Sequence, residues 1–226
     1  MTIESSKVIG GIGALFLLLG SLPYIGEFSF GVLSLIGVIM IFVALNGFAN
    51  YYKERKIFTN AIYALVISIV GVVAIAAMAL YFLFDTDIIT NFFKDIFPSW
   101  NGSWTTISSL AGSTPNTASI NMPHVVAFLG VLFAVLVVAW VFAIVAAFYV
   151  RRSLKIVAEK TSTKYFATAG LLVLIGAFLL IIFIGAILIW VAEIVLIIAF
   201  FSMRTEQSQQ PPMKQMQPPS TTPTPV

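Results

Sequence analysis

Residues 166–203 read FATAGLLVLIGAFLLIIFIGAILIWVAEIVLIIAFFSM, an apolar run of 38 residues in which Glu193 is the single charge. The hydrocarbon core of a bilayer is about 30 Å thick and takes about 20 helical residues. One straight helix of this length would extend for about 57 Å, which is too long for one crossing. The run therefore predicts two spans joined by an apolar turn, placed at Ile184-Gly185 because glycine tolerates positive φ.

The whole chain has the composition of a membrane protein. Of its 226 residues, 60% are hydrophobic and 9% are charged, whereas a soluble domain carries about 25% charged residues. The long runs are apolar on every face, which argues against a soluble bundle of amphipathic helices. The predicted fold is all-α, an integral membrane six-helix bundle in residues 1–203. The predicted spans are about 8–22, 31–49, 58–84, 124–150, 165–183 and 186–203, with an outer loop at 85–123.

The basic residues indicate the orientation. Eleven of the twelve fall on one side of this six-span arrangement, and only Lys94 falls on the other. The eleven are Lys7, Lys53, Arg55, Lys56, Arg151, Arg152, Lys155, Lys160, Lys164, Arg204 and Lys214. Cytoplasmic loops carry the excess of Lys and Arg, so we expect both termini in the cytoplasm of a cell-membrane protein. A single element at 166–203 would put Arg204 and Lys214 outside, which is a second argument for the hairpin.

The outer loop contains one helical pattern. Its apolar residues recur on one face, which predicts a short amphipathic helix that ends before Pro98. These residues are Ile88, Ile89, Phe92, Phe93, Ile96 and Phe97. The helix either lies on the outer membrane surface or packs over the mouth of the bundle. We expect 99–121 to be irregular, and Asn101-Gly102-Ser103 is a sequon that makes Asn101 a candidate glycosylation site.

The C-terminal segment differs from the rest of the chain. Residues 204–226 are rich in Gln, Pro and Thr. Such a composition cannot bury a core, so we expect a disordered cytoplasmic tail.

Catalytic and metal-binding patterns are missing from the sequence. There is no cysteine, and His124 is the single histidine, which is too few for a metal site or a His-based triad. The basic residues lie in short loops beside spans, where they indicate topology rather than nucleic-acid binding. We therefore expect no enzymatic activity, no cofactor, no metal and no nucleic-acid partner.

Glu193 is the residue whose position needs an explanation. It lies ten residues before Met203, about 15 Å along a helix, and a charge at that depth costs about 2.5–3.5 kcal/mol. Ser68 lies at similar depth and Thr168 nearer the inner face, so the candidate intramembrane polar site is Glu193, Ser68 and Thr168. Three roles are open: a proton or cation site in a pathway, a neutral carboxyl group that fixes helix register, or a contact with a partner subunit.

Several segments resemble a known family. The chain is similar to an archaeal family of multi-spanning membrane proteins that is catalogued as a domain of unknown function. The similar segments are Ser5-Ser6-Lys7-Val-Ile-Gly-Gly-Ile-Gly-Ala-Leu15, Ala44-Leu45-Asn46 with Tyr51-Tyr52-Lys53, Ile57-Phe58-Thr59-Asn60, Phe166-Ala-Thr-Ala-Gly-Leu-Leu172, Leu174-Ile-Gly-Ala177 and Ile198-Ala-Phe-Phe-Ser202. The resemblance covers about residues 3–84 and 124–203. It implies an archaeal cell membrane and brings no activity and no functional residues.

These observations favour a non-enzymatic accessory or scaffold component of a membrane assembly. Its expected partners are the lipid bilayer and either other membrane proteins or a second copy. The alternative is a small transporter or channel for a proton, a cation or a small solute that uses Glu193.

Overall fold

The structure, a computed structural model, describes residues 2–21, 29–84, 86–116, 118 and 120–203, and every regular element in this part of the chain is a helix. Within these residues, six helices are long and apolar enough to cross a membrane, which confirms the predicted fold class at that level. The elements are α1 (Ile3–Gly20), α2 (Ser29–Tyr51), α3 (Arg55–Phe84), α4 (Ile88–Ile96), η1 (Trp104–Gly112), α5 (Met122–Thr161), α6 (Lys164–Leu179), η3 (Leu180–Ile182) and α7 (Ile184–Ser202). The tail at 204–226, predicted to be disordered, lies outside the described residues.

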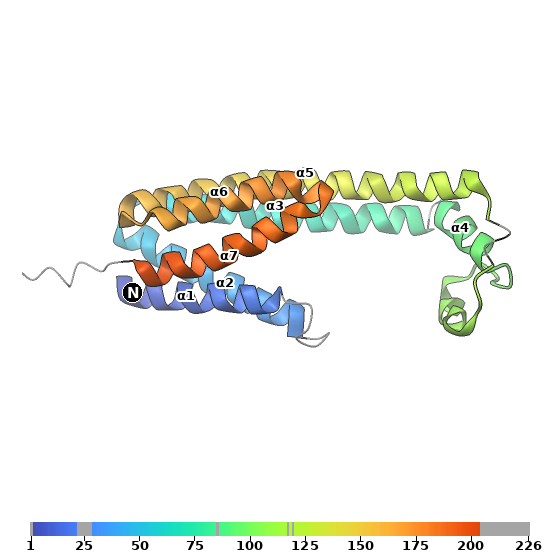
Figure 1. Cartoon of the computed structure of the whole chain (residues 1–226), viewed down its shortest axis with the longest axis horizontal. Coiled ribbons are helices and arrows are strands. Elements are labelled where there is room, and N and C mark those ends of the chain that lie inside the picture. The colour runs from blue at the N-terminus through green and yellow to red at the C-terminus, as the bar shows by residue number, and fades with distance from the viewer. Residues whose placement is uncertain (1, 22–28, 85, 117, 119, 204–226) are drawn as a thin grey trace, which may run out of the picture.

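The six long helices form a closed ring. Each packs against the next along the chain, in the order α1, α2, α3, α5, α6 and α7, and α7 returns to pack against α1. The start of α1, the α2–α3 turn, the α5–α6 turn and the end of α7 lie at the same end of the ring (Figure 1). We call this the basic end, since it carries Lys7, Lys53, Arg55, Lys56, Lys160 and Lys164.

Short polar segments produce the tight turns at the basic end. Helix α1 begins at Ile3 because the Thr2 hydroxyl caps it, accepting a hydrogen bond of 3.2 Å from the Ser5 amide. Lys53 follows α2 with φ of 52°, and Ser162 follows α5 with φ of 53°. Left-handed residues at these positions end a helix and reverse the chain.

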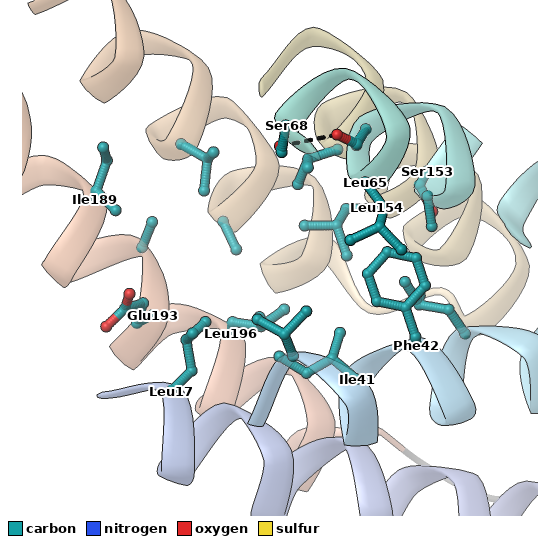
Figure 2. Close-up of a pocket in the computed structure, with 18 residues that line it drawn as sticks. Leu17, Ile41, Phe42, Leu65, Ser68, Ser153, Leu154, Ile189, Glu193 and Leu196 are labelled. Atoms are coloured by element: carbon teal, nitrogen blue, oxygen red, sulfur yellow. Dashed lines mark hydrogen bonds between the residues drawn. The ribbon is translucent and has the colours of Figure 1, made fainter. Parts of the chain in front are cut away.

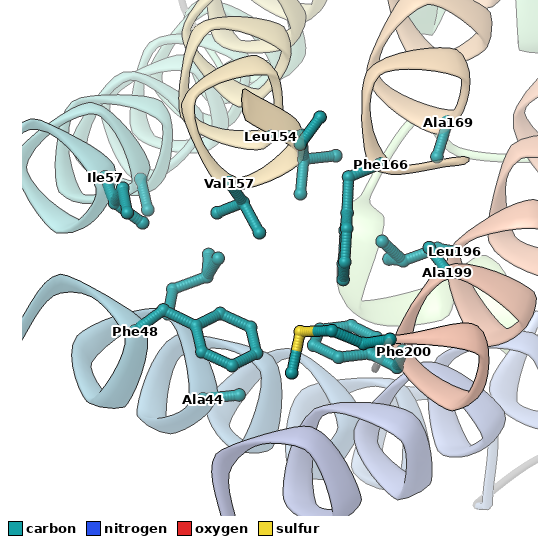
Figure 3. Close-up of a cluster of buried hydrophobic side chains, with 14 of the residues drawn as sticks. Ala44, Phe48, Ile57, Leu154, Val157, Phe166, Ala169, Leu196, Ala199 and Phe200 are labelled. Atoms are coloured by element: carbon teal, nitrogen blue, oxygen red, sulfur yellow. The ribbon is translucent and has the colours of Figure 1, made fainter. Parts of the chain in front are cut away.

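An aromatic cluster fills the ring at the basic end (Figure 3). The ring centroids of Phe48 and Phe200 are 6.0 Å apart, and those of Phe166 and Phe200 are 5.1 Å apart in an edge-to-face arrangement. Ile57 and Val157 pack in the same buried cluster. Side chains from α2, α3, α5, α6 and α7 therefore meet in one core.

Helix α5 is longer than predicted. The predicted spans end at 150 and resume at 165, which leaves 151–164 as an inner loop, but the helix continues to Thr161. The segment is made largely of good helix formers, and Ser153, Leu154, Val157 and Ala158 are buried on one face. Tertiary packing of that face explains why a charged segment stays helical.

The turn in the 166–203 run also differs from its prediction. The positive φ belongs to Phe183, at 62°, rather than to Ile184 or Gly185, which lie in α7. Gly185 is needed for a different reason, because a side chain there would collide with the backbone oxygen of Gly176. Close packing of α6 on α7, rather than backbone freedom, therefore requires this glycine.

The α3–α5 pair reaches far beyond the other helices (Figure 1). The Trp140 indole donates to the Phe178 carbonyl oxygen at 3.1 Å, near the end of α6. Eighteen residues of α5 precede Trp140, or about 27 Å of helix, while α6 and η3 turn back at Phe183. The far end of the α3–α5 pair therefore stands well past the α6–α7 turn.

Two short helices sit at that far end. Helix α4 forms where the apolar spacing predicts a helix, and it packs against the ends of α3 and α5 rather than over the mouth of the ring. The prediction that 99–121 is irregular is wrong over η1. Its Trp104 packs on Phe93 and on the buried Trp100, with ring centroids 5.9 and 5.1 Å apart. This aromatic contact gives the segment a core of its own.

We expect Gly13→Ala to lower the apparent melting temperature of the purified protein. A Cβ at Gly13 would lie 2.7 Å from Met40 Cβ and 2.8 Å from the Gly37 oxygen, so α1 and α2 would have to separate, at a cost of about 1–3 kcal/mol. Thermal unfolding in detergent, followed by tryptophan fluorescence, measures the change. Gly130→Ala is the matched control, because nothing lies within 4 Å of its added Cβ. Equal melting temperatures for the two variants would contradict this account of helix packing.

Candidate functional site

The ring encloses a cavity of about 430 Å³. All six long helices contribute side chains to its wall, which is apolar except for Ser68, Ser153 and Glu193. Leu45, Leu154 and Leu196 belong both to this wall and to the buried core, so the cavity lies directly beyond the aromatic cluster. The protein thus surrounds an apolar chamber that is closed at the basic end.

Glu193 lies at one edge of the chamber, next to Leu17 and across the cavity from Ser68 (Figure 2). The Ser21 hydroxyl donates to Glu193 Oε2 at 3.0 Å, and the Trp190 indole donates to the Ser21 oxygen at 3.0 Å. Ser21 follows the last residue of α1, so this chain of hydrogen bonds joins α1 to α7. Ser21 was not among the polar residues predicted to lie near Glu193, which were Ser68 and Thr168.

The carboxyl group of Glu193 is only partly satisfied. Ser21 has a single hydroxyl proton, and the Leu18 carbonyl oxygen, 2.8 Å away, competes for it. Within the described residues, Glu193 Oε1 has no hydrogen-bond partner and no basic side chain pairs with the carboxyl group. Glu193 is half-buried, and this oxygen has capacity left for another donor.

The structure brings together two of the three predicted polar residues. Ser68 lines the same chamber as Glu193, but its hydroxyl donates to the Ala64 carbonyl oxygen of its own helix at 2.9 Å. Thr168 is exposed on α6, does not line the chamber, and donates to the Lys164 carbonyl oxygen at 3.3 Å. The functional role of these residues remains a prediction.

Ser153 is a polar residue of the chamber that the sequence analysis missed. It is 1% exposed, and its hydroxyl donates to the Ile57 carbonyl oxygen at 2.7 Å. The sequence feature that could have indicated it is the helical spacing of Ser153, Leu154, Val157 and Ala158, which form the buried face of α5. These residues lie in the segment predicted to be a loop. The bond ties α5 to the start of α3 at the inner limit of the chamber.

Asn101, the predicted glycosylation site, lies at the end of the molecule opposite the basic end. Asn101 is exposed, and its Oδ1 accepts hydrogen bonds of 2.9 Å from the Ser103 amide and from the Thr106 hydroxyl. Its glycosylation remains a prediction. His124 Nδ1 lies 2.8 Å from Asp95 Oδ2. In the described part of the chain, no group of three or more His, Asp or Glu side chains is placed to hold a metal ion.

Comparison with known proteins agrees with the family resemblance noted above. A family model described as "Protein of unknown function (DUF996)" matches residues 33–194. The chain is also 25% identical over 204 residues to the uncharacterized protein MJ1644 of Methanocaldococcus jannaschii, an alignment that covers 90% of this chain and 94% of that protein. No solved structure matches.

We predict that Ser21 and Glu193 are energetically coupled. Combining Ser21→Ala with Glu193→Met should give a coupling of about 0.6 kcal/mol and no more than about 1.7 kcal/mol, the average and the maximum found for hydrogen bonds between membrane helices. Chemical unfolding of the detergent-solubilised protein measures the four states of the cycle. Ser68→Ala combined with Glu193→Met is the control, and it should be additive within about 0.5 kcal/mol, because Ser68 bonds only to its own helix. Additivity of the Ser21 pair would contradict a bond that holds α1 to α7.

Proposed function

We propose that this chain, which belongs to the DUF996 family of proteins of unknown function, is a non-enzymatic accessory or scaffold protein of the cell membrane. The observation that carries the proposal is the α3–α5 pair, which extends past the other four helices and holds a folded unit formed by α4 and η1 (Figure 1). We call it the outer unit. A scaffold needs a surface held in a fixed position for its partners, and this unit supplies one.

Specific contacts fix the outer unit on its support. Asp95 of α4 pairs with His124 of α5 at 2.8 Å and accepts a hydrogen bond of 3.1 Å from the Asn121 amide. The rings of Phe92 and Phe128 stack with centroids 4.1 Å apart. The unit is therefore held by polar and aromatic contacts together, which supports a role in presenting a surface.

The proposed orientation follows from the charges. The basic end gathers both described ends of the chain and the two polar turns, while Lys94 lies in the outer unit. Cytoplasmic segments carry more Lys and Arg, so both termini are cytoplasmic and the outer unit is extracytoplasmic. Exposed apolar side chains such as Val72, Val126 and Phe133 on the extended pair then face lipid or neighbouring membrane proteins.

We expect the outer unit to contact a partner protein in the native membrane. A photo-crosslinking amino acid at Ile107, which is 41% exposed on η1, should yield one stoichiometric adduct, identified by mass spectrometry. The same amino acid at Leu171, 39% exposed on α6, is the matched control and should yield none. A protein that purifies in mild detergent as a free monomer, with no adduct at either position, would contradict the scaffold role.

A second candidate is a proton or cation pathway, and the observation in its favour is the partly satisfied Glu193 carboxyl group on the chamber wall. An ionisable residue at membrane depth is a functional candidate. The apolar wall and the aromatic cluster that closes the chamber make this the weaker proposal.

If Glu193 carries ions, Glu193→Gln should abolish proton- or cation-dependent flux into proteoliposomes that contain the full chain. The reason is that the amide cannot bind or release a proton. Ser68→Ala is the control, and it should retain flux because Ser68 bonds only to its own backbone. Flux that Glu193→Gln leaves unchanged, or a wild-type protein without flux, would rule this candidate out.

A further inference from the structure

We propose that the chamber binds one single-chain amphiphile, with its hydrocarbon chain among the apolar side chains and a protonated amine at Glu193. This binding site goes beyond the accessory role and does not depend on it. The proposal rests on the size and lining of the chamber, on the unused acceptor capacity of Glu193, and on the sparse packing between α2 and α3.

The size and lining of the chamber suit a hydrocarbon chain. Its volume of about 430 Å³ falls within the range of about 300–1,000 Å³ that is typical of ligand sites. The lining extends from Val38 to Leu45 on α2 and from Ile189 to Leu196 on α7, which is about 10 Å along each helix. If the chamber were empty, these side chains would lose the dispersion contacts that a chain restores.

Water is a poor occupant of this chamber. A buried water molecule needs about two to four polar partners, whereas the lining offers three polar side chains that are spread over three helices. The hydroxyl protons of Ser68 and Ser153 are already donated to the Ala64 and Ile57 carbonyl oxygens. An apolar occupant from the surrounding bilayer suits the wall better.

Glu193 determines the chemistry of the head group. Its Oε1 is unpartnered among the described residues, and Oε2 shares one hydroxyl proton with a backbone acceptor. An amine brings both hydrogen-bond donors and a charge opposite to that of the carboxylate. A charge-assisted hydrogen bond of this kind is about twice as strong as a neutral one, so an amine should bind more tightly than an alcohol of the same chain length.

The α2–α3 side is the least tightly packed part of the ring. Helices α2 and α3 are joined by a short turn at the basic end (Figure 1), and they pack against each other less extensively than any other neighbouring pair. The chamber lies between them, since Phe42 of α2 and Leu65 and Ser68 of α3 all line it. We therefore place the entry for a molecule dissolved in the bilayer between these two helices, a route that avoids the aromatic cluster.

The test measures the binding of decylamine and of 1-decanol to the full chain in nanodiscs, by native mass spectrometry. The wild-type protein should hold one decylamine per chain. Glu193→Gln should weaken decylamine binding by about tenfold or more and change 1-decanol binding by less than about threefold. Ala64→Leu, which fills the chamber, should abolish the binding of both probes.

Controls keep the result decisive. Ala77→Leu adds the same side chain at an exposed position of α3 and should bind both probes as the wild type does. If Ala64→Leu fails to fold, Ala169→Leu fills the chamber from α6. The proposal is overturned if the wild type forms no one-to-one adduct, if the chamber-filling variant binds as well as Ala77→Leu, or if Glu193→Gln leaves decylamine binding unchanged.

Discussion

Close contact between small residues is the constraint on which the rest of this structure depends. Lipid is as apolar as the helices, so the hydrophobic effect does not drive membrane helices together, and close packing must do so. Gly13 and Gly37 bring α1 against α2, and Gly176 and Gly185 bring α6 against α7. Two tight hairpins therefore stand on either side of the α3–α5 pair, and the six helices assemble as a ring.

The ring explains both the core and the chamber. At the basic end the rings of Phe48, Phe166 and Phe200 pack against one another. Beyond them lies the chamber, which is lined mostly by aliphatic side chains. The first and last helices close the ring, through the Lys7 amine donating to the Met203 carbonyl oxygen at 2.6 Å and through Ser21 donating to Glu193. The carboxyl group thus lies where the ring closes.

Hydropathy and charge predicted the six long helices, the short helix α4 and the gathering of basic residues, because each depends on local composition. Other features depend on tertiary contacts that no local pattern shows. Helix α5 continues past Val150 because its charged segment has a buried face, and the α6–α7 turn uses Phe183 because Gly185 is needed for packing. Ser21 became the partner of Glu193 through the pairing of the first and last helices, which the sequence did not indicate.

Closure of the ring by α1 and α7 is the claim that can be tested most directly. The chain contains no cysteine, so Lys7→Cys with Met203→Cys provides a unique pair for a short bis-maleimide crosslinker. The account predicts an efficient crosslink within one chain, with a yield that does not depend on protein concentration. After proteolytic cleavage in the outer unit, the crosslink should keep the N-terminal and C-terminal halves of the chain joined. Absence of a crosslink, or crosslinking only between two chains, would contradict a closed ring.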